Sequence, residues 1–119
     1  MGAGENIVKN GVLEVLKLFG VEAWLVQSGL VKVRGGYMHL APNGTSDIVG
    51  YLPYTGRILT VEAKEKGKQP RKDQIDFLAR VGNAGGVGLV VDDVERFTHQ
   101  IVQILDEDEK MAKYMQMMV

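Results

Sequence analysis

The sequence predicts an α/β fold in which helices flank a mixed β-sheet. Helical and extended segments alternate in the order α-β-β-β-α-β-α. A helix connects the third predicted strand to the fourth, so we expect these two strands to be parallel with a right-handed crossover. The 119 residues are 45% hydrophobic and 24% charged and include no cysteine. This composition supports one core without disulfides, so we expect a single domain over 1–119 with a C-terminal helical extension over about 106–119.

The first half of the chain is predicted to contain a helix, a strand and a loop. Apolar residues at helical spacing predict a helix over 5–19, which Gly20 ends as its C-terminal cap. Gly11 lies inside this helix and costs it about 1 kcal/mol relative to alanine. A short strand is predicted over 22–27, and the glycine-rich stretch over 28–45 is expected to be a loop.

The central part of the chain predicts a hairpin followed by a helix. Residues 47–52 and 57–64 have the composition of strands, and residues 53–56 between them have the chemistry of a turn. Pro70 suits the first position of a helix, and the apolar stripe that follows extends this helix to about Val81.

The last part predicts an apolar strand and a helix. Residues 87–91 are all apolar or glycine, which is typical of a strand buried on both faces. Asp92 and Glu95 have the spacing of a capping box, which predicts that a helix begins here and continues through Leu105. Four apolar residues beyond it continue the helical spacing and fit either the core or a frayed end of a monomer, or a dimer interface: Met111, Tyr114, Met115 and Met118.

Charge is unevenly distributed along the chain. The formal net charge is −1 and the pI is about 6.1, which argues against indiscriminate binding to nucleic acid. Residues 57–80 hold seven basic and four acidic residues, whereas residues 92–109 hold seven acidic residues and one arginine. Such runs are commonly solvated surfaces, and only the first run favours phosphate. No stretch approaches the ~18 apolar residues of a membrane span, and residues 1–6 do not form a secretory signal. We therefore expect an intracellular protein that binds no membrane.

The most informative group of residues is Asp47, Glu62 and Lys64. Residues two apart in a strand share a face, so Glu62 and Lys64 point to the same side. The hairpin brings Asp47 opposite Glu62, and two facing carboxylates repel unless a cation neutralises them. Mg²⁺ or Mn²⁺ is commonly held by such carboxylates, and the Ala63 carbonyl offers a further oxygen. Lys64 could then orient water or stabilise a charged transition state. The alternative is a surface ion pair worth about 0–1 kcal/mol.

Gln74 and Glu5 are weaker candidates when each is taken alone. Gln74 lies in the first turns of its predicted helix, where it could hydrogen-bond the same water or Lys64. Glu5 lies in the first turn of the N-terminal helix, where the helix dipole favours an acid. Glu14, on the same helix, is an alternative to Glu5. Taken alone, Gln74 is more commonly a solvated helix residue than a functional one, and Glu5 is an ordinary first-turn acid.

Several short motifs occur in order along the chain. They are GTSDI at 44–48, VEAK at 61–64, GKQPRKDQ at 67–74 and AGG at 84–86, directly before VGLVV at 87–91. This ordered set resembles a VRR-NUC domain, the virus-type replication-repair nuclease branch of the PD-(D/E)XK superfamily. The resemblance extends from Glu5 to about Phe97. Ser46 stands where many members of the family have proline.

The resemblance implies a restriction-endonuclease-like core and a metal-dependent, structure-selective DNA endonuclease. It implies that Asp47 and Glu62 are ligands of Mg²⁺ or Mn²⁺, that Lys64 is the catalytic lysine, and that Gln74 is the helix glutamine. Glu5 would match the glutamate of the family's first helix. Stand-alone virus-type members act as homodimers on branched DNA such as four-way (Holliday) junctions, which makes branched DNA and a second copy the expected partners.

Basic residues near the predicted site are candidates for contacts with nucleic acid. Arg34 and Tyr37 lie in the glycine-rich stretch, although a loop residue without this role is equally common. Four more candidates follow the catalytic strand and could hold flanking phosphates: Lys66, Lys68, Arg71 and Lys72. His39 and His99 are assigned no role. The alternative function is a non-catalytic dimeric module of the same fold that binds a DNA structure or a protein.

Overall fold

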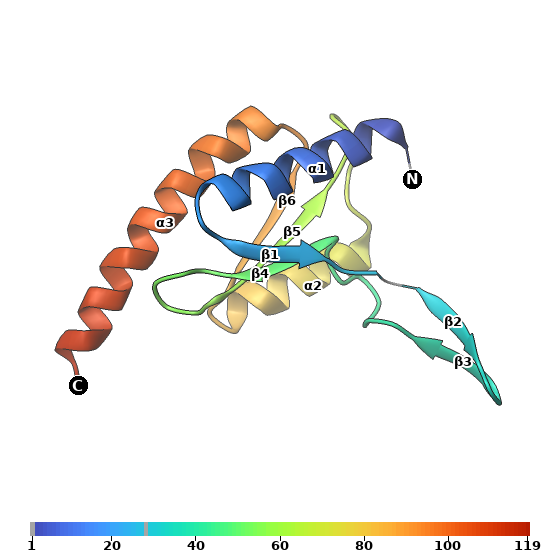
Figure 1. The fold of residues 1–119 in the computed structure, drawn as a ribbon. Coiled ribbons are helices and arrows are strands. Elements are labelled where there is room, and N and C mark those ends of the chain that lie inside the picture. Colours follow the sequence, from blue (N-terminus) through green and yellow to red (C-terminus); the bar gives the residue numbers. More distant parts are fainter. Residues whose placement is uncertain (1, 28) are drawn as a thin grey trace.

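The computed structural model describes residues 2–27 and 29–119 and shows a mixed α/β fold (Figure 1). Its main sheet has the strand order β1-β4-β5-β6. These strands are β1 (Glu22–Leu25), β4 (Ile48–Tyr51), β5 (Ile58–Ala63) and β6 (Val87–Val91). The first three are antiparallel neighbours, whereas β5 and β6 are parallel. The predicted mixed sheet, its hairpin and the parallel pair that follows are therefore confirmed.

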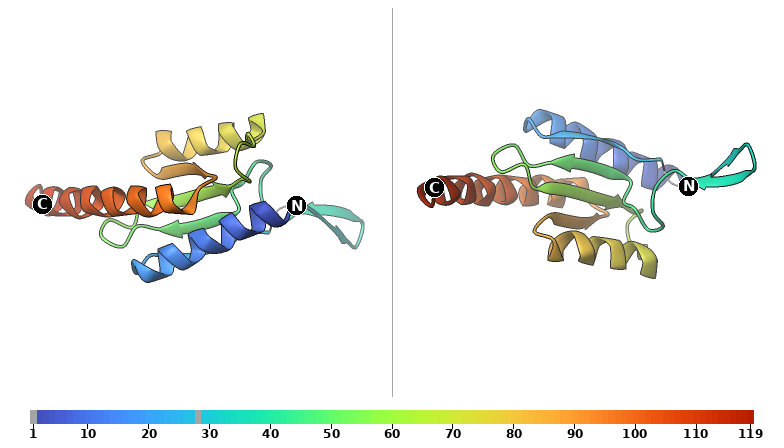
Figure 2. Two further views of the ribbon diagram at one scale, coloured as in Figure 1. Left: turned by 90° about the horizontal axis from the view of Figure 1, so that it is seen from above. Right: turned by 90° about the horizontal axis from the view of Figure 1, so that it is seen from below.

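Helices cover both faces of this sheet. Helices α1 (Ala3–Leu18) and α3 (Val94–Met117) pack against each other on one face, and α2 (Lys72–Asn83) packs on β5 and β6 from the opposite face (Figures 1 and 2). Alternation along β5 explains both contacts. Leu59 and Val61 point into the core formed with α1 and α3, and the intervening residues point the other way.

Two glycines explain how α1 ends and how closely it approaches α3. Gly20 has φ +73°, a conformation that glycine adopts without strain, and Val21 donates its backbone N–H to Leu16 at 2.9 Å. The predicted end of this helix is therefore confirmed. A Cβ atom at Gly11 would lie 2.7 Å from the side chain of Val94, so glycine allows the close crossing of α1 and α3.

Helix α3 is longer than the helix predicted through Leu105, because it continues without a break through most of the predicted extension and ends at Met117. Asp108 lies within this helix and is completely buried against the turn between β4 and β5. Its carboxylate accepts hydrogen bonds from the backbone N–H groups of Tyr54 (3.0 Å) and Thr55 (3.3 Å), and from the Thr55 hydroxyl at 2.5 Å. Arg57 forms an ion pair with it at 3.3 Å. The Asp108 side chain therefore connects α3 to the β4–β5 hairpin.

Two predicted helix starts and one predicted strand environment are wrong. Asp93, not Asp92, caps α3, because its side chain accepts the Arg96 N–H at 3.1 Å. Pro70 precedes α2 rather than opening it, since Arg71 is the cap residue. Strand β6 is an edge strand that is only partly buried, with Val90 41% exposed, so its apolar sequence does not reflect burial on both faces.

The glycine-rich stretch contains a hairpin that the sequence analysis treated as a loop. Strands β2 (Leu30–Val33) and β3 (Gly36–His39) form a separate antiparallel pair. The turn between them consists of Arg34 and Gly35, and Gly35 has φ +90°. Alternating residues around a glycine turn are the usual signal of a hairpin. Ser28, at the start of the predicted loop, lies outside the described residues.

The described helices can be compared with the dimensions of a membrane span. Within residues 2–27 and 29–119, none of the three helices combines the length and the hydropathy that a membrane-spanning segment requires.

We expect Asp108→Ala to lower the free energy of unfolding by about 3 kcal/mol, because it leaves the turn amides and Arg57 without their buried acceptor. Urea denaturation followed by circular dichroism measures this loss. Asp106→Ala is the matched control, since it removes only an exposed ion pair with Lys110 and should cost less than about 1 kcal/mol. Equal losses in the two variants would contradict the assignment of Asp108 as the anchor of the helix.

Candidate functional site

A cavity of about 270 Å³ lies where β4 begins and β5 ends, beside the N-terminal turns of α1 and α2. The predicted catalytic residues come from four separate segments of the chain, and all five of them line this cavity: Glu5, Asp47, Glu62, Lys64 and Gln74. Gly44, Thr45 and Arg71 complete the lining. The fold therefore brings together the side chains that the sequence analysis selected.

Asp47 and Glu62 face each other across the β4–β5 pair. Ile48 is paired with Val61, so the next position in each direction places Asp47 opposite Glu62. Asp47 Oδ2 accepts a hydrogen bond from the backbone N–H of Ala63 at 3.0 Å, which fixes its carboxylate beside β5. Glu62 is 2% exposed, and its Oε1 atom has no hydrogen-bond partner. A buried carboxylate oxygen without a partner is costly and requires an explanation.

Lys64 lies between two carboxylates. Its Nζ atom is 3.7 Å from Glu62 Oε2 and 3.7 Å from Glu5 Oε1, and its side chain is 12% exposed. Glu5 thus reaches the site from α1, whereas Glu14 borders a different hollow with Lys17. The geometry favours Glu5 over Glu14. The contact between Lys64 and Glu62 is also buried, unlike the surface ion pair that was the alternative interpretation.

The pKa of Glu62 is raised to about 8, first by burial and then by its interactions with the facing Asp47 carboxylate. Lys64 lowers this pKa, but not enough to offset the loss of water and the second acid. At neutral pH Glu62 therefore retains its proton in most molecules when no cation is bound. A bound divalent cation would reverse this preference, since it stabilises the ionised carboxylates.

The loop before β4 packs on the first turn of α2. Gly44 has φ +83°, and a Cβ atom there would lie 2.1 Å from the backbone oxygen of Asp73, so only glycine allows this approach. Thr45, which follows it, lines the cavity. These two residues were not among the predicted site residues, although their position just before Asp47 was a signal of their role. The contact fixes α2 relative to the acidic pair.

Gln74 has a defined orientation at the start of α2. Its Oε1 atom accepts the backbone N–H of Arg71 at 2.8 Å, as the N3 residue does in a capping box. An N–H donor requires an oxygen acceptor, so the amide oxygen must face the helix end. The Nε2 group donates no hydrogen bond to any residue that the structure describes. Gln74 therefore offers the cavity a donor rather than an acceptor.

The residues present fit a divalent cation of the Mg²⁺ or Mn²⁺ type. Across residues 2–27 and 29–119, no cluster of three or more His, Asp or Glu side chains is arranged to hold a metal ion. Such ions, however, are commonly held by one or two carboxylates together with water and substrate oxygens. Asp47 and Glu62 provide that number, and the unpartnered Oε1 of Glu62 is an oxygen that lacks a positive group. Ala63 contributes its amide to Asp47, and its carbonyl remains a predicted ligand.

The basic residues after β5 do not form one unopposed positive patch. Arg71 lines the cavity but is 3.2 Å from Asp73, and Lys72 is 3.2 Å from Asp76. The backbone N–H of Arg96 and the charges of Arg96 and Lys66 hold the pKa of Asp93 below its usual range, which places Lys66 near the start of α3. Lys68 lies in the loop before α2, whereas Arg34 lies in the turn of the separate hairpin.

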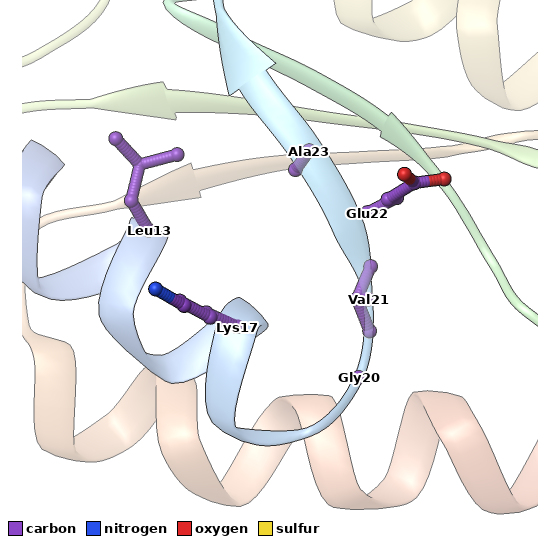
Figure 3. A pocket seen from close by; sticks show the side chains of 6 residues that line it. All are labelled: Leu13, Lys17, Gly20, Val21, Glu22 and Ala23. Atoms are coloured by element: carbon purple, nitrogen blue, oxygen red, sulfur yellow. The ribbon is translucent and has the colours of Figure 1, made fainter.

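A second hollow of about 420 Å³ lies between the end of α1 and β1 (Figure 3). Its lining includes Leu13, Val21 and Ala23, and its two charged side chains, Lys17 and Glu22, extend in different directions. No acid and base converge there. This hollow therefore lacks the arrangement that distinguishes the cavity around Glu62.

Comparison with known proteins does not assign this chain to a family. No protein-family model matches it, and no curated protein has a matching sequence. The features of this chain that bear on function are therefore the cavity and the ordered motifs whose residues line it.

The pKa of Glu62 gives a test in metal-free buffer. The folded chain keeps this proton up to about pH 8, whereas the unfolded chain releases it near pH 4.5. The free energy of unfolding should therefore fall as pH rises through this window, by up to about 5 kcal/mol. Glu62→Gln carries no such proton, so its stability relative to wild type should rise by that amount. Urea denaturation at several pH values in EDTA measures the difference, and parallel pH profiles would contradict it.

Proposed function

We propose that this chain is a metal-dependent nuclease of the VRR-NUC type that hydrolyses phosphodiester bonds in DNA. One observation carries the proposal: the buried Glu62 faces Asp47, and the Nζ atom of Lys64 lies 3.7 Å from Glu62 Oε2 in the same cavity. A carboxylate pair with an adjacent cationic donor suits the binding of a hard cation and of a phosphate together.

The arrangement of elements supports this proposal. Helix α1, strands β1, β4 and β5, helix α2, strand β6 and helix α3 follow the expected order α-β-β-β-α-β-α, and the β2–β3 hairpin is inserted between β1 and β4. In this interpretation the insertion lengthens the link between two core strands without changing the sheet. The acidic pair lies at the end of the two central strands.

Asp47 and Glu62 would hold Mg²⁺ or Mn²⁺, with the Ala63 carbonyl as a further ligand. When bound, such an ion lowers the pKa of a coordinated water and draws electrons from the phosphate. The carboxylates must be ionised to bind it, so affinity should increase with pH towards the raised pKa of Glu62.

The chain's own donors would stabilise the reacting phosphate. During hydrolysis a water oxygen forms a bond to phosphorus, the bond from phosphorus to the leaving sugar oxygen breaks, and negative charge increases on the phosphate oxygens. Lys64 is held by Glu5 and Glu62 within the cavity and would donate to these oxygens. Gln74 would add a neutral N–H donor from its Nε2 group, and Arg71 a second positive charge.

We further propose branched DNA as the substrate and a homodimer as the active form. The domain is too small to hold a separate DNA-binding module, so a two-fold dimer would widen its contact with DNA. Met111, Tyr114, Met115 and Met118 are exposed in the single chain and thus do not belong to its core. They remain candidates for the dimer interface. The alternative, a DNA-structure or protein-binding module without turnover, uses the same fold.

We expect the wild-type chain to cleave DNA with Mn²⁺ or Mg²⁺ and to lose this activity in excess EDTA. Lys64→Ala and Glu62→Gln should reduce the rate at least about 100-fold, because each removes a group that acts on the phosphate or its cation. Gel assays with linear, flap and four-way substrates at two salt concentrations measure cleavage. Lys17→Ala at the distant hollow is the control and should remain active. Cleavage that persists in EDTA would exclude the metal-dependent mechanism.

The orientation of Gln74 predicts that Gln74→Glu and Gln74→Ala lower the cleavage rate equally, but that only Gln74→Ala lowers the free energy of unfolding. Gln74→Glu keeps an oxygen for the Arg71 N–H, so the cap and the stability are retained. It replaces the amide donor by an acceptor and should therefore lower the cleavage rate as much as Gln74→Ala, which also loses the cap. Ile75→Glu adds the same charge at the next, exposed position and controls for repulsion of DNA. A Gln74→Glu variant with normal activity would show that Gln74 acts only as a cap.

A further inference from the structure

The β2–β3 hairpin projects from the body of the molecule. Figures 1 and 2 show it extending away from the sheet and the three helices. Its strands pack mainly on each other, and Leu30, Tyr37 and Met38 are all more than half exposed. A two-stranded hairpin alone is marginally stable in water, and this one has no extensive contact with another element. Its sequence is therefore not explained by packing within the chain.

The two faces of the hairpin differ in chemistry. Lys32 is paired with Tyr37, and Leu30 with His39, so these four side chains share one face. Val31 is paired with Met38, which places an apolar pair on the other face. Arg34 lies in the turn at the tip of the hairpin. One face thus carries a positive charge, an aromatic ring and a histidine, and the tip adds a second positive charge.

The charge of this segment differs from that of the rest of the chain. Residues 23–46 include Lys32 and Arg34 but no aspartate or glutamate. The remaining residues include 12 Lys and Arg against 15 Asp and Glu. Arg71 and Lys72 at the start of α2 are paired with Asp73 and Asp76, whereas Lys32 and Arg34 have no acidic residue in their own segment. The hairpin is therefore an exposed segment without acidic residues, and its charge complements a polyanion.

The hairpin also has the size and the position to contact a duplex that places one of its phosphates in the cavity. The major groove of B-DNA admits a two-stranded β-ribbon, and each strand of this ribbon has four residues and is about 13 Å long. The chain passes from β3 through residues 40–43 into Gly44 and Thr45, which line the cavity. The base of the hairpin is thus directly continuous with the wall of the site.

We propose that the β2–β3 hairpin is a nucleic-acid-binding arm that lies in a groove of the duplex flanking the cavity. Lys32 and Arg34 contact phosphates, and Tyr37 packs on the sugars or base edges between them. This proposal rests on the proposed function for the identity of the polyanion. The arm gives a small domain a second point of contact with DNA, separate from the reacting phosphate, and sets the direction in which the duplex leaves the site.

The test compares wild type with Lys32→Ala/Arg34→Ala in binding a labelled duplex and a four-way junction in EDTA, by fluorescence anisotropy over a series of salt concentrations. Loss of two phosphate contacts should weaken binding roughly 50-fold at 0.1 M salt and reduce the slope of log K against log salt by about 2. Both side chains are on an exposed hairpin, so circular dichroism should be unchanged. Lys110→Ala/Lys113→Ala removes the same charge from α3 and should change binding less than about 3-fold.

Unchanged affinity and slope in the hairpin variant would overturn the arm, even if the wild-type chain cleaves DNA in Mn²⁺. Conversely, if the slope of log K against log salt is smaller in the hairpin variant than in wild type but neither protein cleaves DNA, the arm is supported and the proposed catalysis is excluded. A second copy is the other possible occupant of this surface. If Val33→Asp/Met38→Asp changes the sedimentation coefficient while DNA affinity stays at the wild-type value, the hairpin serves self-association and the arm is excluded.

Discussion

The buried contact between Glu62 and Asp47 is the constraint on which the interpretation of this structure depends. An unpartnered carboxylate oxygen beside a second acid destabilises the fold, and an apolar residue at position 62 would fill the same place without this cost. Lys64 offsets only part of the repulsion, because the pKa of Glu62 remains raised. Such a cost is typical of a functional site, and a bound divalent cation would remove it.

The rest of the fold holds this pair in place. Asp108 fixes the turn between β4 and β5, and the register of these strands places Asp47 opposite Glu62. At the other end, Gly44 lets the preceding loop pack directly on α2, which determines where Gln74 and Arg71 face the cavity. Asp108 on α3, the register of β4 and β5, and the loop at Gly44 thus position Asp47, Glu62 and Gln74, which are far apart in the sequence.

The sequence predicted the main sheet and the grouping of Asp47, Glu62 and Lys64 because their signals are local, whereas Glu5 and Gln74 were selected through the family resemblance. Alternation along 57–64 places Glu62 and Lys64 on one face, and the short turn at 53–56 defines the partner strand. The errors arose where local patterns do not determine the environment of a residue. The apolar strand β6 lies at an edge of the sheet. Asp108 is buried by contacts with Tyr54 and Arg57, which are 54 and 51 residues away in the sequence. The β2–β3 hairpin was missed because its many glycines outweighed a weak alternation. The capping role of Gln74 also depends on where α2 begins, which Pro70 suggested incorrectly.

The acids in the cavity discriminate between a nuclease and a binding module. A surface that only binds DNA gains from positive charge, and carboxylates beside the phosphate would weaken binding. Glu5, Asp47 and Glu62 nevertheless line the same cavity as Lys64 and Arg71. With a divalent cation on Asp47 and Glu62 the repulsion becomes an attraction, and the cation is then placed where a phosphate would enter. The acidic pair therefore opposes simple binding and favours metal-assisted hydrolysis, and contacts that serve affinity alone are better supplied by the hairpin, which has no acids.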